Sequence, residues 1–279
     1  MLQISDRLTA VAALVTEQGT LADVGTDHGY IPVYLTGQKR IQRAIAMDIN
    51  EGPLLRAEEH IRQYQMEQVI ETRLSDGLSA LREQEADTIV IAGMGGALMM
   101  RILEDGADKA ESARELILQP QSELCAFRAF LYRQGYIISA EDMVYEDGKY
   151  YPMMRVHPPG KYSQSDSQTE VVQRQECRKE RLKNTEELMA EDSRFRLNCK
   201  YGELLLADRH PVLLQYLKWQ RKQKEEILGK IRKNAKQDAG SREAELLAEL
   251  ADIDLALEGW EQGTPCSPSQ ELLHDRTVL

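Results

Sequence analysis

The 279 residues carry a net charge of −11, with 42% apolar and 29% charged side chains, a composition that excludes a chain disordered throughout. No uncharged apolar run approaches the ~20 residues of a membrane-spanning helix, so we expect no membrane partner. The negative net charge argues on average against a nucleic-acid partner. No two of the four cysteines have the spacing of metal ligands or of a redox pair, so we expect no metal site and reduced thiols in a cytoplasmic protein (Cys125, Cys177, Cys199 and Cys266).

Residues 1–160 alternate short apolar runs with helical patterns, as a parallel sheet covered by helices does. After a first amphipathic helix, several runs are apolar without alternation, which is typical of strands buried on both faces. Two later runs joined at Gly148 alternate more, and they predict an antiparallel hairpin that closes the sheet. The predicted strands are 21–25, 43–49, 70–75, 87–93, 115–120, 136–147 and 149–158.

Helical spacing predicts helices between the strands over 51–66 and 122–135. Pro53 suits a first helical turn, and Ser122 and Gly135 are expected to cap the two ends of the second helix. From about residue 158, turn formers and small polar residues indicate a linker. The helices predicted beyond it are 166–191, 195–207, 211–236 and 241–260.

The last two helices are expected to pair as a coiled-coil hairpin, because the apolar stripe of the final helix is too small for a globular core. The predicted domains are therefore 1–160, a cofactor-binding α/β domain, 161–265, a helical domain, and 266–279, a loose tail. Residues 1–160 hold 15 basic and 24 acidic side chains, whereas Arg209–Lys236 holds nine basic and two acidic ones. This basic run indicates a phosphate-binding surface, with a solvated helix face as the alternative.

The loop from Asp23 to Gly29, DVGTDHG, follows the first predicted strand directly. Glycines at positions 25 and 29 let the backbone approach a ligand, and the next helix presents free N–H groups to it. A carboxylate at Asp27 would repel the pyrophosphate of a dinucleotide but attract the sulfonium and ammonium groups of S-adenosylmethionine. The loop therefore favours S-adenosylmethionine over NAD, and the alternative is an ordinary glycine-containing turn.

Three further motifs follow the next strands. Asp48 lies nineteen residues beyond Gly29, where a carboxylate accepts hydrogen bonds from a ribose diol, although it could instead cap the next helix. Asp76-Gly77 would meet the exocyclic amine of adenine, or form a simple turn. The fourth strand runs into AGMGG (92–96), whose glycines leave room for a ligand, with a flexible turn as the alternative.

Together these motifs resemble the bacterial tRNA adenine-N1-methyltransferases that act on position 22. The resemblance covers nearly the whole chain, including the LQPQSE, Lys200-Tyr201-Gly202 and His210-Pro211-Val212 pieces. It implies a Rossmann-like class I methyltransferase with a seven-stranded sheet and a C-terminal coiled-coil hairpin. It also implies S-adenosylmethionine as cofactor, tRNA as partner and N1 of adenine 22 as methyl acceptor, and we expect a monomer. The tRNA and the N1 atom come from the resemblance alone.

The candidate catalytic residues are Asp27, His28 and Tyr30, since Asp27 could hold the cationic end of the cofactor or accept from adenine N6. His28 could donate to the base and Tyr30 could stack on it; alternatively His28 caps a helix and Tyr30 packs inward. The predicted cofactor-binding residues are Asp23, Gly25, Thr26, Asp27, Gly29, Asp48, Ile49, Asp76, Gly77, Ala92, Gly93, Met94 and Gly95. The predicted RNA-binding residues are Arg209, Lys218, Arg221, Lys222, Lys230 and Lys233.

Other functions compete with this interpretation. A methyltransferase could act on another RNA, a protein or a small molecule, and a non-catalytic module could use the hairpin to bind a partner. The Asn/Asp-Pro-Pro-aromatic motif that many amino-directed methyltransferases place after the fourth strand is absent, and Gly93-Met94-Gly95-Gly96 stands there. The sequence therefore leaves open which residues grip the base.

Overall fold

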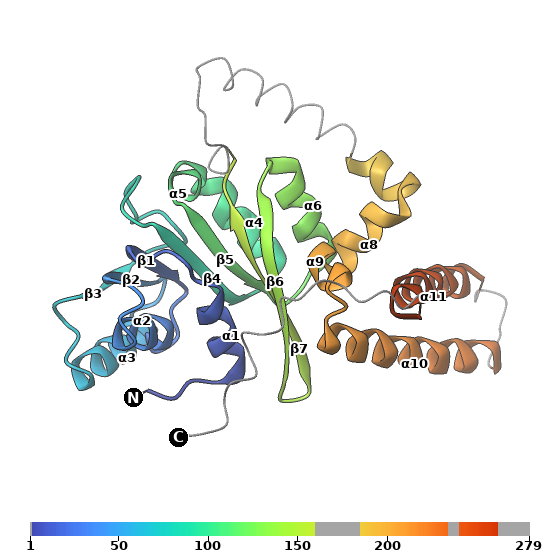
Figure 1. The fold of residues 1–279 in the computed structure, drawn as a ribbon, viewed down its shortest axis with the longest axis horizontal. Helices are drawn as coiled ribbons and strands as arrows, with labels where there is room; N and C mark the ends of the chain where they lie inside the picture. The colour runs from blue at the N-terminus through green and yellow to red at the C-terminus, as the bar shows by residue number, and fades with distance from the viewer. Residues whose placement is uncertain (1, 160–184, 234–239, 262–279) are drawn as a thin grey trace, which may run out of the picture. The chain divides into compact units, whose positions relative to one another are not determined.

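The structure is a computed structural model that describes residues 2–159, 185–233 and 240–261 (Figure 1). The chain divides into two compact units, Met1–Leu205 and Leu206–Leu279. The predicted domain boundary at residue 160, the tail 266–279 and most of the predicted helix 166–191 lie outside the described residues. No helix within the described ranges is both long enough and apolar enough to cross a membrane.

The first unit contains a seven-stranded sheet. Its strands are β1 (Thr20–Val24), β2 (Arg43–Asp48), β3 (Ile70–Leu74), β4 (Thr88–Met94), β5 (Glu115–Pro120), β6 (Ile137–Glu146) and β7 (Lys149–His157). They are ordered β3-β2-β1-β4-β5-β7-β6, the first five are parallel, and β7 is antiparallel to both β5 and β6. The predicted five parallel strands and closing hairpin are therefore confirmed.

Helices cover both faces of this sheet, as Figure 1 shows. They are α1 (Asp6–Leu14), α2 (Tyr30–Gly37), α3 (Glu51–Gln63), α4 (Gly96–Asp105), α5 (Ala107–Ser112) and α6 (Leu124–Gln134). One core cluster joins α1, α2 and α3 to the sheet through Val11, Ile31 and Ile61. The other joins α4 and α6 to the opposite face, with Met99 and Phe127 fully buried. The central strands are apolar without alternation because both of their faces are covered.

The end of the first unit is a helix broken at Gly202, where the sequence predicts one continuous helix over 195–207. The structure has α8 (Ser193–Tyr201) and α9 (Glu203–Ala207) instead. Gly202 has φ +97°, and a Cβ on it would lie 2.6 Å from a carboxylate oxygen of Glu141. Glu141 also pairs with Arg128 at 2.9 Å, and both side chains are almost fully buried. The break therefore lets the chain pass over a buried ion pair.

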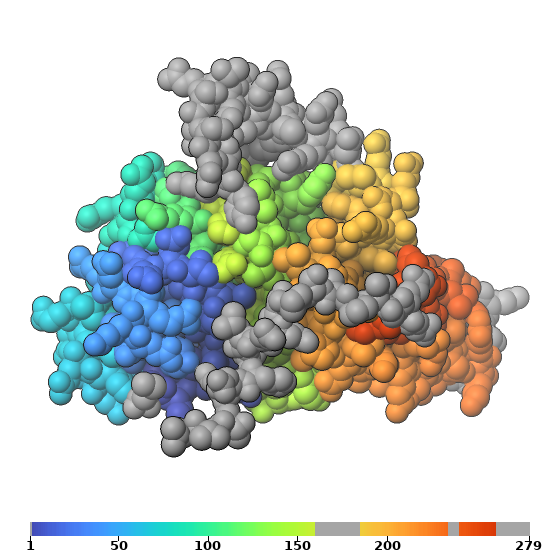
Figure 2. Space-filling model, in the orientation of Figure 1, coloured from blue at the N-terminus to red at the C-terminus, as the bar shows by residue number. Residues whose placement is uncertain are grey.

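The second unit contains a pair of helices, α10 (Pro211–Lys233) and α11 (Gly240–Glu261). They contact each other, and they are the orange and red helices that lie side by side in Figure 1 and adjoin in Figure 2. Leu217 of α10 and Ile253 of α11 are fully buried. The ion pairs between them are Arg232–Glu243 (2.8 Å), Lys224–Glu249 (2.5 Å) and Arg221–Asp254 (3.1 Å). Because residue numbers rise on one helix as they fall on the other, the helices are antiparallel, as predicted.

The predicted cap at Ser122 is wrong. Glu123, with φ +50°, occupies the N-cap position of α6 and makes no side-chain cap hydrogen bond. The Ser122 hydroxyl donates to the Glu123 carboxylate instead of capping the helix. The predicted C-cap at Gly135 is confirmed, with φ +82° and a hydrogen bond from its N–H to Leu131 O.

Candidate active site

The loop after β1 is held against the end of β2 by backbone hydrogen bonds. The N–H groups of Gly25 and Thr26 both donate to Met47 O, each at 2.8 Å. Gly25 (φ +72°) and Gly29 (φ +64°) adopt left-handed backbone conformations, which is why glycine stands at both positions. Gly29 is the N-cap residue of α2, so the loop ends on a helix N-terminus. The N–H groups expected to face a ligand are therefore at this edge of the sheet.

Asp23, the fourth residue of β1, is buried and accepts a hydrogen bond from the Thr26 hydroxyl at 2.6 Å. Burial raises the pKa of this carboxyl group to about 6, against the lowering effect of Thr26, and the nearby charges of Asp27 and Asp48 raise it further. A cation placed among these three carboxyl groups would favour the ionised form of Asp23. The charge of these three carboxyl groups thus favours a positively charged ligand at this loop.

Gly25 also lies against the loop that follows β4. A Cβ built on Gly25 would lie only 2.1 Å from Met94 Cε. Since Met94 is partly buried and packs against the core, any larger residue at position 25 would displace its side chain. The two predicted cofactor-binding loops, after β1 and after β4, are therefore in direct contact.

Asp27, His28 and Tyr30 lie at the surface of the first loop. The Asp27 side chain is 74% exposed, and His28 Nε2 lies 3.5 Å from its carboxylate. The His28 ring stacks on Tyr30, with ring centroids 5.3 Å apart. Tyr30 in turn meets the edge of His60 at 5.2 Å, and His60 Nδ1 lies 2.9 Å from the carbonyl oxygen of His28.

These contacts bear on the alternatives for His28 and Tyr30. His28 is not the helix cap, because Gly29 occupies that position and α2 has no side-chain cap. His28 has φ +55°, an uncommon conformation for a non-glycine residue. The hydrogen bond to His60 and the ring stack hold it there. Tyr30 is half-buried between two histidine rings and so neither packs fully inward nor stands free.

The ends of β2 and β3 carry the predicted adenosine-binding residues. Asp48 is partly exposed, and its carboxylate accepts the Asn50 N–H at 2.8 Å, so it does order the turn before α3. Its other oxygen makes no hydrogen bond within the described residues. Ile49, beside it, is 57% exposed. An exposed apolar side chain next to a carboxylate suits the face and the diol of a nucleoside.

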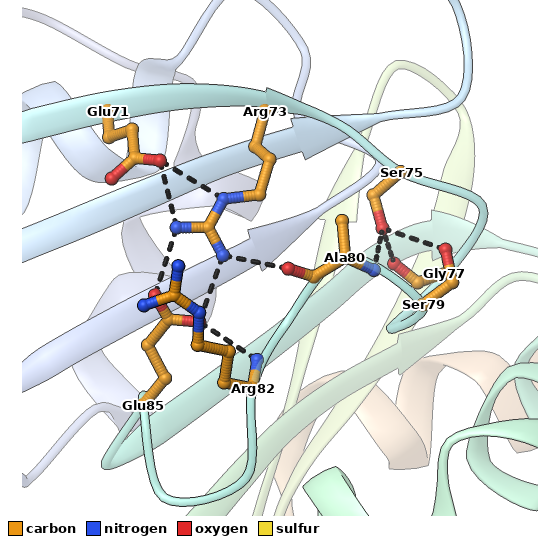
Figure 3. Close-up of polar contacts among 8 residues, drawn as sticks. All are labelled: Glu71, Arg73, Ser75, Gly77, Ser79, Ala80, Arg82 and Glu85. Carbon is orange, nitrogen blue, oxygen red and sulfur yellow. Dashed lines mark hydrogen bonds and ion pairs between the residues drawn. The ribbon is translucent and has the colours of Figure 1, made fainter.

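The turn after β3 is fixed by a polar network that Figure 3 shows. The Ser75 hydroxyl donates to Gly77 O at 2.8 Å and accepts the Ala80 N–H at 3.1 Å. Arg73 donates to Ala80 O and pairs with Glu85, at 2.8 and 2.9 Å. The Arg73 guanidinium lowers the pKa of Glu85 to about 2. Asp76 stays exposed on this rigid turn, and no sequence motif indicated the residues that support it.

The glycines at the end of β4 and just after it have different roles. Gly93 (φ +83°), the last but one residue of β4, is exposed, and a Cβ there would lie 3.8 Å from both Arg7 Nη1 and Gln121 Nε2. A Cβ on Gly95 would lie 2.9 Å from Ser122 Oγ, and one on Gly96 would lie 2.5 Å from Ser122 O. Gly95 and Gly96 therefore allow the segment after β5 to pack closely, whereas Gly93 is exposed beside the Arg7 and Gln121 side chains.

The structure brings the predicted cofactor residues of the first unit together at the carboxyl ends of β1 to β4. In open parallel sheets this edge is where ligands bind. Arg7, His60 and Gln119 lie at this edge as well. No motif identifies Arg7 on α1 or His60 on α3, whereas Gln119 on β5 belongs to the LQPQSE piece, to which the sequence assigns no role. Among the residues that the structure describes, no group of three His, Cys, Asp or Glu side chains is arranged to hold a metal ion.

Five of the six predicted RNA-binding residues lie on α10 of the second unit, and Arg209 lies just before that helix. Arg221 pairs with Glu225 and Asp254. Lys218, Lys222, Lys230 and Lys233 make no ion pair within the described residues. A groove of about 530 Å³ lies on the hairpin. Its apolar part is formed by Leu214, Leu257 and Trp260, and its mostly basic rim by Lys218, Arg221, Lys222 and one acidic residue, Glu225.

Comparisons with known proteins agree with this fold. Residues 4–154 match the family described as "Methyltransferase domain". A curated relative from Bacillus subtilis (strain 168), named tRNA (adenine(22)-N(1))-methyltransferase, is 39% identical over 153 residues, which are 55% of this chain and 64% of the relative. The alignment thus spans less than two thirds of that relative.

Solved structures with the same fold cover more of the chain. The crystal structure of Streptococcus pneumoniae Sp1610, described as a putative tRNA (m1A22) methyltransferase, is 29% identical, with a TM-score of 0.73, and covers 91% of this chain and 100% of that one. The structure of Sp1610 in complex with S-adenosyl-L-methionine is 28% identical, with a TM-score of 0.71 and the same coverage. Since the family match includes more than half of the chain, with every strand up to β6 and most of β7, the chain belongs to the methyltransferase-domain family.

Proposed function

We propose that this protein transfers the methyl group of S-adenosylmethionine to N1 of adenine 22 in tRNA. The observation that carries the proposal is that the glycine loop after β1 is bonded to the end of β2, which brings Asp23, Asp27 and Asp48 close enough for their charges to interact. Three carboxyl groups suit a sulfonium and an ammonium group and would repel a pyrophosphate. A cationic methyl donor is therefore a better ligand here than a dinucleotide.

The relatives supply the substrate part of the proposal. The Bacillus subtilis relative is named for adenine 22 and its N1 atom, and the Streptococcus pneumoniae protein is described in the same terms and has been crystallised with S-adenosyl-L-methionine. The region of this chain that matches the methyltransferase-domain family contains the loops that follow β1, β2 and β4. We therefore assign the same cofactor and the same acceptor atom to this chain.

The chemistry requires little from the protein beyond positioning. Adenine N1 has a lone pair that is unprotonated at neutral pH, so it can displace the methyl group in line without a strong base. The protein must hold the nucleophile and the methyl group close together and draw the adenine out of its stack. The methyl group moves from sulfur to N1, and the electrons of the broken bond return to sulfur.

Asp27, His28 and Tyr30 are the residues that we assign to the acceptor base. Asp27 is exposed enough to accept a hydrogen bond from adenine N6 or to face the cofactor's ammonium group. Tyr30 and His28 present a stacked pair of rings that could extend onto a flipped base. The contact from His60 fixes this pair before the RNA arrives, which reduces the entropy lost on binding.

The hairpin is the proposed tRNA-binding element. Its basic rim suits phosphates, and Trp260 at the groove offers a ring on which a base could stack. Arg209, Lys218, Arg221, Lys222, Lys230 and Lys233 remain the candidate residues, with Arg221 the weakest because two carboxylates already neutralise it. A tRNA substrate also suits a cytoplasmic protein that needs no metal.

Methyl transfer from labelled S-adenosylmethionine to tRNA transcripts tests the proposal. An unmodified transcript with adenine at position 22 should accept about one methyl group, and the same transcript with guanine there should accept none. Equal labelling of both transcripts, or labelling of protein or small molecules only, would reject tRNA position 22 as the target. Failure of S-adenosylmethionine to bind in calorimetry would favour a non-catalytic module instead.

A further inference from the structure

Arg7 is a cation at the ligand-binding edge of the sheet that none of the sequence motifs includes. It lies on α1, and its Nη1 atom donates to the side-chain oxygen of Gln119 at 3.1 Å. The same oxygen accepts the Gly93 N–H, also at 3.1 Å. Because Gln119 is fully buried on β5, it fixes both the end of β4 at Gly93 and the guanidinium of Arg7 in one arrangement.

The guanidinium is also held from a second side. Its central carbon lies 5.5 Å from the ring centroid of Tyr151, over the ring face. The carboxylate of Glu146 accepts the backbone N–H of Arg7 at 3.3 Å and makes no ion pair with its side chain. Within the described residues, Arg7 therefore has one side-chain hydrogen bond, one aromatic contact and no carboxylate partner.

The position of Arg7 points to the ligand. A Cβ built on Gly93, an exposed residue near the end of β4, would lie 3.8 Å from Arg7 Nη1 and 3.8 Å from Gln121 Nε2, so two N–H-bearing side chains lie beside this glycine. The surroundings are acidic, since residues 1–160 hold 24 acidic and 15 basic side chains. A partly buried arginine that is positioned by two neighbours yet not neutralised retains N–H donors for an incoming anion.

We propose that Arg7 is an anion-binding residue of this site, which holds an oxyanion beside Gly93. A guanidinium fits a carboxylate or a phosphate with two parallel hydrogen bonds. Two groups of the proposed reaction have this chemistry, namely the carboxylate of the cofactor's methionine part and a phosphate of the target nucleotide. The inference rests on the proposed function for the identity of these two sources, but its geometry does not depend on which RNA is methylated.

The test uses Arg7→Gln, which keeps a side-chain donor for Gln119 and removes the charge, and Arg7→Lys, which keeps the charge. Arg43→Gln is the matched control, because Arg43 is exposed at the amino end of β2, the opposite edge of the sheet. Thermal unfolding of each variant checks that α1 remains in place. Binding of S-adenosylhomocysteine and of 5′-methylthioadenosine, which lacks the amino-acid part, is measured by calorimetry, and tRNA binding is measured against salt.

If the anion is the carboxylate, Arg7→Gln lowers the affinity for S-adenosylhomocysteine about ten- to a hundredfold and leaves the affinity for methylthioadenosine unchanged. If it is a phosphate, both nucleosides bind normally and the slope of log affinity against log salt for tRNA falls by about 0.7 to 0.9. In either case Arg7→Lys keeps more of the wild-type binding than Arg7→Gln, and Arg43→Gln behaves as wild type. If Arg7→Gln changes neither the nucleoside affinities nor the salt slope of tRNA binding, the proposal for Arg7 is overturned. If the wild-type protein transfers no methyl group to tRNA, only the proposed function is overturned.

Discussion

Asp23 is the buried carboxyl group of the candidate site, and we expect its ionisation to change when a cationic ligand binds. Its folded pKa of about 6 lies above its ordinary value of 3.8 because burial penalises the charged form. Its contribution to the stability of the unliganded protein is therefore fully present below pH 3.8 and is lost as pH rises through about 6. A cationic ligand has the opposite preference, since it favours ionised Asp23.

We expect the affinity for S-adenosylmethionine to rise between about pH 5 and pH 7, by up to about tenfold per pH unit below the pKa of Asp23. Calorimetry over this range measures it. Asp23→Asn should bind more weakly at neutral pH and show a flatter pH profile. A wild-type affinity that is constant over the same range would mean that Asp23 does not face the cationic part of the ligand.

The exposed side chain of Asp27 is expected to matter for methyl transfer and not for folding. Because its side chain is exposed and its backbone carbonyl accepts the Tyr30 N–H, at 3.3 Å, Asp27→Ala should leave the thermal unfolding temperature near that of wild type. Methyl transfer should be nearly abolished, by a factor of at least about 100 if Asp27 orients the base or the cofactor. Glu67→Ala, an exposed acidic residue outside the site, is the control. Near-normal turnover in Asp27→Ala would remove Asp27 from the catalytic residues.

The packing of the α8–α9 segment against β6 depends on a buried ion pair. Arg128 and Glu141 are neutralised by each other, and Glu141 also accepts the Leu204 N–H at 3.0 Å. Removing one partner leaves a buried charge uncompensated. Replacing both by apolar residues of similar size removes that penalty.

Glu141→Gln should therefore lower the free energy of unfolding by about 3–5 kcal/mol. The double variant Arg128→Met/Glu141→Met should lower the free energy of unfolding by less than Glu141→Gln does. Urea unfolding measures both. Glu203→Gln, an exposed change in the neighbouring α9, should have little effect. If Glu141→Gln unfolds at the same urea concentration as wild type, the pair does not anchor α8 and α9.

The elements show where sequence reasoning succeeds. The strands were predictable because β1, β2, β4 and β5 are apolar runs of a length that suits buried strands. The break at Gly202 was not, because the carboxylate that occupies the space beside it comes from residue 141. The site divides in the same way, since glycines and carboxylates at fixed spacing identify the loops, whereas Arg7 and His60 reach them only through tertiary packing.

At the scale of the whole molecule, an acidic chain is proposed to bind a polyanion through one basic helix hairpin. Lys218→Glu/Lys222→Glu should weaken tRNA binding at low salt. It should also make the slope of log affinity against log salt concentration shallower, by about 0.9 for each phosphate that is no longer neutralised. Binding of S-adenosylmethionine should not change. Reversing Lys39 and Lys149, two exposed lysines of the first unit, alters net charge equally and serves as control. Equally weakened binding in both double variants would indicate a net-charge effect rather than a hairpin surface.

Mass mapping of nucleosides in tRNA treated with the protein and S-adenosylmethionine is the decisive experiment for the proposed reaction. We expect 1-methyladenosine in the fragment that contains position 22 and no other new modification. N6-methyladenosine at that position, a methyl group at any other nucleotide, or unmodified tRNA despite bound cofactor would contradict it.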